Sequence, residues 1–160
     1  MPALSRLANH GLLWVVAGAA LWASGDPRAR RAARRGLGSL AVASATANIV
    51  GKGLSGRRRP DFEVPAPRRL PKPSSSSFPS GHAANAAAFA TGAAIEMPSL
   101  AAPAIGLAVL VGASRVATGL HYPSDVLAGA AIGTAAALLT LRWWPRRSRP
   151  TPRVMARRPR

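Results

Sequence analysis

The side chains best suited to bind or transfer a phosphate group gather in three clusters in the middle of the chain. The clusters are Lys52 with Arg59, then Ser80 with Gly81 and His82, and then Arg115 with His121 and Asp125. Lysine and arginine neutralise phosphate oxygens, and a histidine beside a carboxylate has the groups needed for nucleophilic attack and proton transfer. Phosphoryl-transfer chemistry is therefore the first hypothesis that these residue types raise.

The second cluster stands directly before a long apolar stretch, which predicts the start of a helix. A helix N-terminus presents free backbone N–H groups and the positive end of the helix dipole, so it favours a bound phosphate. Ser80 adds a hydroxyl, and Gly81 lets the backbone approach a ligand closely. We expect His82 just inside this helix.

The third cluster places a histidine four residues before a carboxylate. Pro123 argues against one continuous helix from His121 to Asp125, so we expect a turn that leads into a helix with Asp125 in its first turn. A hydrogen bond between His121 and Asp125 fits either geometry. Taken singly, Asp125 also has an ordinary explanation, a favourable charge at a helix N-terminus.

Five apolar stretches surround these clusters, each near the length that crosses a hydrocarbon core as a helix. They are residues 9–24, 37–54, 81–97, 100–118 and 125–144. A soluble alanine-rich bundle is the alternative, but its helices would carry a polar face at helical spacing, and residues 126–141 show none. The sequence therefore predicts an all-α integral-membrane bundle of about five spans. Small residues such as Gly129 and Gly133 would let its helices pack closely.

Basic residues lie between the apolar stretches: the chain has 22 Lys and Arg, 5 Asp and Glu, and a net charge of +17. Five arginines in 27–35 and eight from Arg142 onward predict that these segments face the cytoplasm of a plasma-membrane protein. The 55–80 loop and the 114–125 loop then lie on the extracytoplasmic side, with all three clusters. A cleaved signal peptide in the first 25 residues is disfavoured because it would export the first arginine cluster.

Two further segments have a distinct composition. The 55–80 loop is rich in Pro, Ser and Arg and has little helical or strand periodicity, so we expect a mobile lid over a site or an entry loop to it. The last residues, 146–160, are strongly basic and predict a disordered cytoplasmic tail after one membrane-embedded domain, residues 1–145.

The three clusters resemble the three-part signature of the type-2 phosphatidic acid phosphatases, also called lipid phosphate phosphatases. The matching patterns are K-x(6)-R-P, P-S-G-H and S-R-x(5)-H-x(3)-D, in order over residues 52–125 without a departure. The resemblance implies a helical core that the family shares with vanadium haloperoxidases and non-specific acid phosphatases. Bacterial integral members usually have six spans, so one N-terminal span is missing here, and a homo-oligomer would complete the bundle.

The resemblance and the chemistry together give each residue a role. His121 is the expected nucleophile that forms a phosphohistidine, Asp125 holds the proton on its other ring nitrogen, and His82 is the expected general acid and base. The expected phosphate ligands are Lys52, Arg59, Ser80, Gly81 and Arg115.

The composition argues against a metal centre or another cofactor. The chain has no cysteine, and its carboxylates are too few and too dispersed for a two-metal phosphatase, which needs several around paired ions. They are Asp26, Asp61, Glu63, Glu96 and Asp125. We therefore expect metal-independent hydrolysis.

Two other functions remain alternatives. A transporter or flippase of phosphorylated lipids also places charges within a membrane, but the chain shows no internal repeat. A basic nucleic-acid-binding protein fits the net charge but not the apolar stretches, so no specific nucleic acid is expected as a partner. The expected partners are the bilayer and a phosphorylated lipid. The small size and Ala/Arg-rich composition are similar to actinobacterial family members and favour a polyprenyl-linked lipid.

Overall fold

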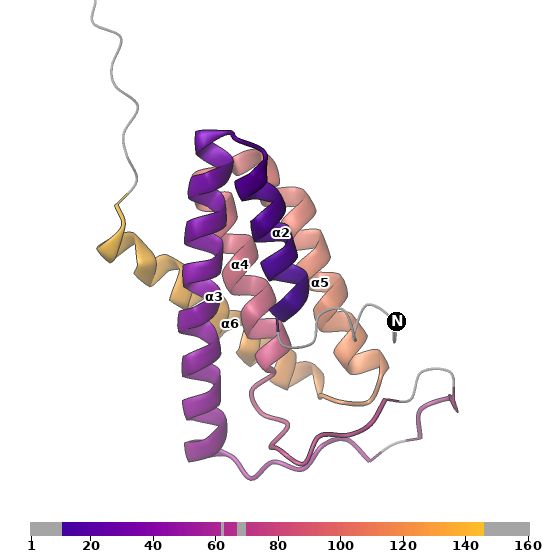
Figure 1. The fold of residues 1–160 in the computed structure, drawn as a ribbon. Coiled ribbons are helices and arrows are strands. Elements are labelled where there is room, and N and C mark those ends of the chain that lie inside the picture. The colour runs from indigo at the N-terminus through magenta and orange to yellow at the C-terminus, as the bar shows by residue number, and fades with distance from the viewer. Residues whose placement is uncertain (1–10, 62, 67–69, 146–160) are drawn as a thin grey trace, which may run out of the picture.

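The computed structural model describes residues 11–61, 63–66 and 70–145, and within these ranges every long regular element is a helix (Figure 1). The elements are α2 (Leu12–Ala23), α3 (Pro27–Leu54), α4 (Gly81–Glu96), the short 3-10 helix η3 (Pro98–Leu100), α5 (Ala101–Ala117) and α6 (Pro123–Trp143). The predicted all-α bundle is confirmed. The predicted tail, residues 146–160, lies outside the described residues.

Helix α4 is the centre of the bundle and packs against α3, α5 and α6. Its buried face is built mostly of alanine, which lets neighbouring backbones come close. Gly129 and Gly133 of α6 lie directly against the α4 backbone near Ser80 and Ala84, where an added Cβ would have no room. The close crossing of α4 and α6 therefore depends on these two glycines.

The first basic segment, residues 27–35, is helical, so the helix that contains the predicted stretch 37–54 begins ten residues earlier, at residue 27. Helix α3 begins at Pro27, and Oδ1 of Asp26 accepts a hydrogen bond of 2.9 Å from the Arg28 amide as an N-cap. Proline is well tolerated at the first helical position, and alanine and arginine are strong helix formers. These local signals outweigh the repulsion between the arginines. The helix therefore includes the basic segment and is 28 residues long, instead of beginning at residue 37.

An ion pair joins α3, α4 and α6 at the end of the bundle away from the 55–80 loop. Nε of Arg35 lies 2.7 Å from Oε1 of Glu96, the last residue of α4. The same guanidinium donates to the Thr140 hydroxyl at 3.1 Å and to the Trp144 carbonyl. Because Arg35 is almost fully buried, these contacts fix the helix ends relative to one another.

Two helical stretches of the described chain are long and apolar enough to cross a membrane: Pro98–Ala117, which joins η3 to α5, and Pro123–Trp143. Their outward faces expose Ile105, Val109 and Leu127. Helix α2 is apolar but only 12 residues long, and α4 has 16 residues. The five predicted stretches therefore correspond to helices, of which two meet this test.

Candidate active site

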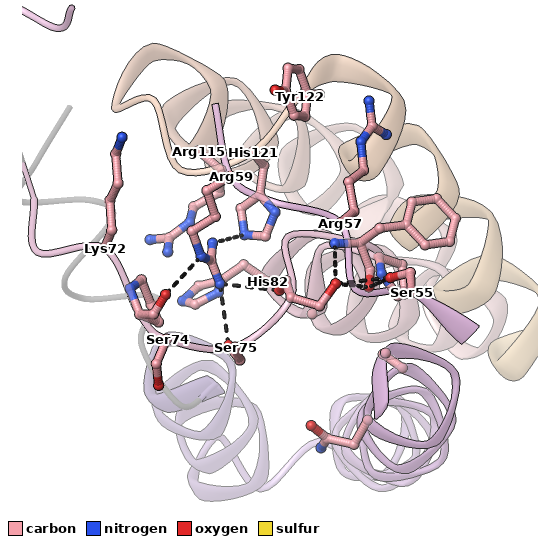
Figure 2. Close-up of a pocket in the computed structure, with 18 of the residues that line it drawn as sticks. Ser55, Arg57, Arg59, Lys72, Ser74, Ser75, His82, Arg115, His121 and Tyr122 are labelled. Atoms are coloured by element: carbon pink, nitrogen blue, oxygen red, sulfur yellow. Dashed lines mark hydrogen bonds between the residues drawn. The ribbon is translucent and has the colours of Figure 1, made fainter. Parts of the chain in front are cut away.

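A cavity of about 1190 Å³ opens where α3 and α5 end and α4 begins (Figure 2). The predicted site residues that line it are Arg59, Gly81, His82, Arg115 and His121. Ser80 and Asp125 are fully buried beside it. Lys52 belongs to the last turns of α3, but its side chain lies outside the described part of the structure. The fold therefore brings residues from all three clusters to one end of the bundle.

The second cluster forms the start of α4, as the sequence predicts. The Ser80 hydroxyl accepts from the Ala83 amide at 3.4 Å and so caps the helix, while the Ser80 amide donates to the Asp125 carbonyl at 2.9 Å. An added Cβ on Gly81 would meet nothing within 4 Å, so the first turn of α4 is open on that side. An anion in the cavity can thus approach the helix N-terminus.

His121 lies in the turn between α5 and α6, and both of its ring nitrogens have neighbours. Nδ1 lies 2.7 Å from the carbonyl oxygen of Ser77, and Nε2 lies 3.4 Å from Nη1 of Arg59. Since a carbonyl only accepts hydrogen bonds, Nδ1 carries the proton and Nε2 keeps its lone pair. Burial, with the charge of Arg59, lowers the pKa of His121 to about 4, so the ring is neutral near pH 7.

Asp125 does not make the direct hydrogen bond to His121 that we expected: its Oδ2 lies 3.8 Å from Nδ1. The turn at Pro123 directs the carboxylate back to the backbone, so Oδ2 accepts from the Tyr122 amide at 2.9 Å. Oδ2 also accepts from the Ser77 hydroxyl at 2.9 Å. Asp125 therefore acts on the imidazole in two ways. Its charge raises the His121 pKa, although burial and the charge of Arg59 lower that pKa by more, and its hydrogen bond to Ser77 holds the residue that contacts Nδ1.

Arg59 lies at the centre of the cavity, with its guanidinium between His121 and His82 (Figure 2). It donates to the Leu120 carbonyl at 2.8 Å, the Pro73 carbonyl at 3.1 Å and the Ser76 carbonyl at 3.3 Å. Burial lowers the Arg59 pKa, and Asp125 opposes that shift. The guanidinium of the buried Arg115 lies beside that of Arg59, on the side away from His121, so two cations stand next to each other in the cavity, an arrangement suited to a phosphate.

Arg57, which sequence reasoning did not single out, pairs with Asp125. Its Nη1 lies 2.8 Å from Oδ1 of Asp125 and 3.0 Å from the Ser124 hydroxyl, and its guanidinium stacks 4.3 Å from the centre of the Tyr122 ring. Three consecutive arginines, 57–59, gave no signal that separates their roles. Together with Arg59, Arg57 connects the 55–80 loop to the third cluster, so the described parts of this loop form a wall of the site.

Ser77 is the second residue that the sequence did not single out. Its carbonyl accepts from His121 and its hydroxyl donates to Asp125, although the side chain is fully buried. The run from Ser74 to Ser77 predicted a polar loop, and a backbone carbonyl carries no signal in residue type. Ser77 therefore links the histidine to the carboxylate in place of the direct contact.

The sequence pattern of the PAP2 superfamily matches residues 33–149, which include all three clusters. The chain belongs to the PAP2 superfamily. The predicted resemblance is thereby confirmed, because this is the family of type-2 phosphatidic acid phosphatases.

Curated relatives of this PAP2 chain are phosphatases of different lipids. It is 37% identical over 134 residues to the decaprenylphosphoryl-5-phosphoribose phosphatase of Mycobacterium tuberculosis, a match that covers 81% of this chain and 71% of that protein. It is 45% identical over 64 residues to the lipid A 1-phosphatase of Rhizobium johnstonii, covering 40% of this chain. That match spans only 26% of the lipid A 1-phosphatase, about a quarter of its length.

Two crystal structures share the fold. A transmembrane PAP2-type phosphatidylglycerolphosphate phosphatase from Bacillus subtilis matches with a TM-score of 0.67 and 27% identity, over 89% of this chain and 73% of that chain. LpxE from Aquifex aeolicus matches with a TM-score of 0.71 over 88% of this chain and 82% of that chain, and its 22% identity supports the fold alone. Together with the two apolar helices, the match to the transmembrane Bacillus subtilis phosphatase supports a membrane protein.

Proposed function

We propose that this PAP2 chain is a metal-independent lipid-phosphate phosphatase that works through a phosphohistidine on Nε2 of His121. The observation that carries the proposal is the 2.7 Å contact between Nδ1 of His121 and the Ser77 carbonyl. This contact fixes the tautomer in which Nε2 carries the lone pair, which faces the cavity and lies 3.4 Å from Nη1 of Arg59. A neutral imidazole in that position is a competent nucleophile.

In the first step, the Nε2 lone pair attacks phosphorus and the bond from phosphorus to the alcohol oxygen breaks. His82, on the other side of the Arg59 guanidinium, donates its proton to the departing oxygen. The alcohol leaves neutral, and His121 becomes a phosphoimidazolium that still carries a proton on Nδ1. The Ser77 carbonyl and the Asp125 carboxylate, 3.8 Å from Nδ1, stabilise that cation.

In the second step, neutral His82 takes a proton from water, and the hydroxide oxygen attacks phosphorus. The bond between phosphorus and Nε2 breaks, the electron pair returns to His121, and inorganic phosphate leaves. Arg59 and Arg115 lie close to the charge that builds up on the phosphoryl oxygens in both steps. Lys52, Ser80 and Gly81 complete the proposed phosphate ligands.

The proposed topology places the active site on the extracytoplasmic side of a multi-pass protein in the plasma membrane. The site lies at the end of the bundle away from the arginines that begin α3, and a positive cytoplasmic side supports this orientation. The membrane domain extends over residues 1–145, and the substrate is a phosphorylated polyprenyl lipid or glycerophospholipid. We also propose that the chain forms a homo-oligomer.

Phosphate release in detergent with EDTA tests the chemistry. We expect the wild-type chain to release phosphate from a lipid phosphate, and His121→Asn and His82→Ala to lower that rate roughly a thousandfold or more. Thr91→Ala, a change on the face of α4 that lines a separate apolar groove, is the matched control. Release that neither histidine variant diminishes, or that vanadate does not inhibit, contradicts the histidine mechanism. Lipid transfer without phosphate release would instead indicate a transporter.

A further inference from the structure

The active-site cavity continues from the histidines into an uncharged polar arm between α3 and α4. Ser44 and Asn48 of α3 and Asn85 of α4 line this arm, together with the small residues Ala47 and Gly51. The first three side chains offer hydrogen bonds without charge, unlike the arginines around the proposed phosphate position. The arm therefore differs in chemistry from the part of the cavity that suits an anion.

Asn85 places an unsatisfied hydrogen-bond acceptor beside the arm. Its Oδ1 atom is buried and has no hydrogen-bond partner in the described structure. A buried carbonyl oxygen without a donor is costly, and such atoms in folded proteins are nearly always satisfied. Oδ1 only accepts hydrogen bonds, so a phosphate dianion cannot satisfy it, whereas an alcohol hydroxyl group can.

The position of Asn85 relative to His82 indicates which part of a substrate reaches it. Asn85 follows His82 by three residues on α4, so both side chains lie on one face of the helix, about one turn apart. In the proposed mechanism, on which this argument rests, His82 protonates the oxygen of the departing alcohol. The atoms attached to that oxygen therefore extend from His82 toward Asn85, Asn48 and Ser44.

We infer that this arm, Ser44, Asn48 and Asn85, binds hydroxyl groups of the departing alcohol. The preferred substrate is then a lipid whose terminal phosphate is esterified to a polyol or sugar headgroup with free hydroxyls. A phosphate attached directly to diacylglycerol, or to a second phosphate, offers no hydroxyl donor at this position. Asn85 is thus a specificity-determining residue, separate from the groups that hold the phosphate.

Two lipids with the same acyl chains test this inference on the full chain in detergent with EDTA. Phosphatidylglycerol phosphate has a free hydroxyl on the glycerol that bears the terminal phosphate, whereas phosphatidate has none. The measured quantity is the ratio of kcat/KM for the first lipid to kcat/KM for the second. We expect a wild-type ratio above one, and Asn85→Ala to lower it about tenfold, the effect of one lost hydrogen bond in a buried site.

Thr91→Ala on the opposite face of α4 is the control and leaves the ratio unchanged. Because both lipids are measured on the same preparation, partial misfolding cancels from the ratio, and Asn48→Ala gives a second reading if Asn85→Ala is inactive. A wild-type ratio below one, or a ratio that neither asparagine variant lowers, overturns the inference and leaves the phosphatase activity standing. A polyprenyl phosphate, whose alcohol carries no other hydroxyl, is measured alongside the two lipids. Release from the polyprenyl phosphate alone overturns this inference, and no release from any of the three by the wild type overturns the proposed function as well.

Discussion

The hydroxyl of Ser77 donates a hydrogen bond of 2.9 Å to Oδ2 of Asp125, and neither side chain is exposed to solvent. The carbonyl of the same serine accepts the Nδ1 proton of His121 at 2.7 Å. One loop residue thus holds both the histidine and the carboxylate. The strength of this link can be measured because the two contacts use different atoms of Ser77, and a side-chain substitution removes only one of them.

Ser77→Ala deletes the hydroxyl and keeps the carbonyl. A fully buried carboxylate loses one donor, and hydrogen bonds to charged groups contribute about 1.5 to 3 kcal/mol, so we expect the free energy of unfolding to fall by about 2 kcal/mol. We also expect kcat to fall while KM changes little, because Asp125 acts on the bound intermediate. Ser99→Ala, at an exposed serine of η3, is the control for both measurements. Equal stability of the two variants would show that the hydroxyl contact is not needed.

The His121 pKa of about 4 predicts a ring that stays neutral well below the usual histidine range. The chain has three histidines, so ¹³C-labelled histidine in an NMR titration resolves them, and the signal that His121→Asn removes identifies this one. We expect its midpoint near pH 4. Arg59→Gln removes a positive charge that disfavours imidazolium, so the midpoint should move to higher pH. A wild-type midpoint near 6.5 would contradict the buried, neutral imidazole.

The sequence predicted the helices and the meeting of the three clusters because both follow from patterns that residue types record. Apolar stretches set the helices, and Ser80 at a helix start and Pro123 at a turn placed their neighbours correctly. The partner of His121 was not predictable, because it is a backbone carbonyl in a loop without periodicity. The helical start of α3 was missed for a different reason: capping by Asp26 and helix propensity are local effects that charge counting ignores.

Arg57→Ala should destabilise the protein more than Arg58→Ala, although the two arginines are adjacent in the chain. Arg57 pairs with the fully buried Asp125 at 2.8 Å and stacks on Tyr122, whereas the Arg58 side chain is exposed. Because the Arg57 side chain is itself 41% exposed, solvent screens the pair, and we expect a difference of about 1 to 2 kcal/mol. Unfolding measured at low and high salt checks this: added salt should reduce the difference. Equal losses of unfolding free energy for both variants would show that the contacts of Arg57 with Asp125 and Tyr122 do not stabilise the fold.

Gly133→Ala should be among the most damaging single substitutions outside the cavity. An added Cβ would overlap the Ala84 carbonyl and crowd the Ala88 amide, and these are backbone atoms that cannot rotate away. Helices α4 and α6 would have to separate, and since α4 begins at Ser80 and α6 carries Asp125 in its first turn, the site would be displaced as well. We expect a loss of about 3 kcal/mol or more, or failure to fold.

Gly106→Ala provides the matched control for that crossing, because a Cβ there meets nothing within 4 Å. Alanine favours a helix over glycine by up to about 1 kcal/mol, so this variant should be as stable as the wild type or more so. Thermal unfolding of both variants in one detergent, with phosphate release measured on each, separates a packing effect from a general intolerance of glycine substitution. If Gly133→Ala unfolds at the same temperature as Gly106→Ala, then the close approach of α4 and α6 does not stabilise the fold.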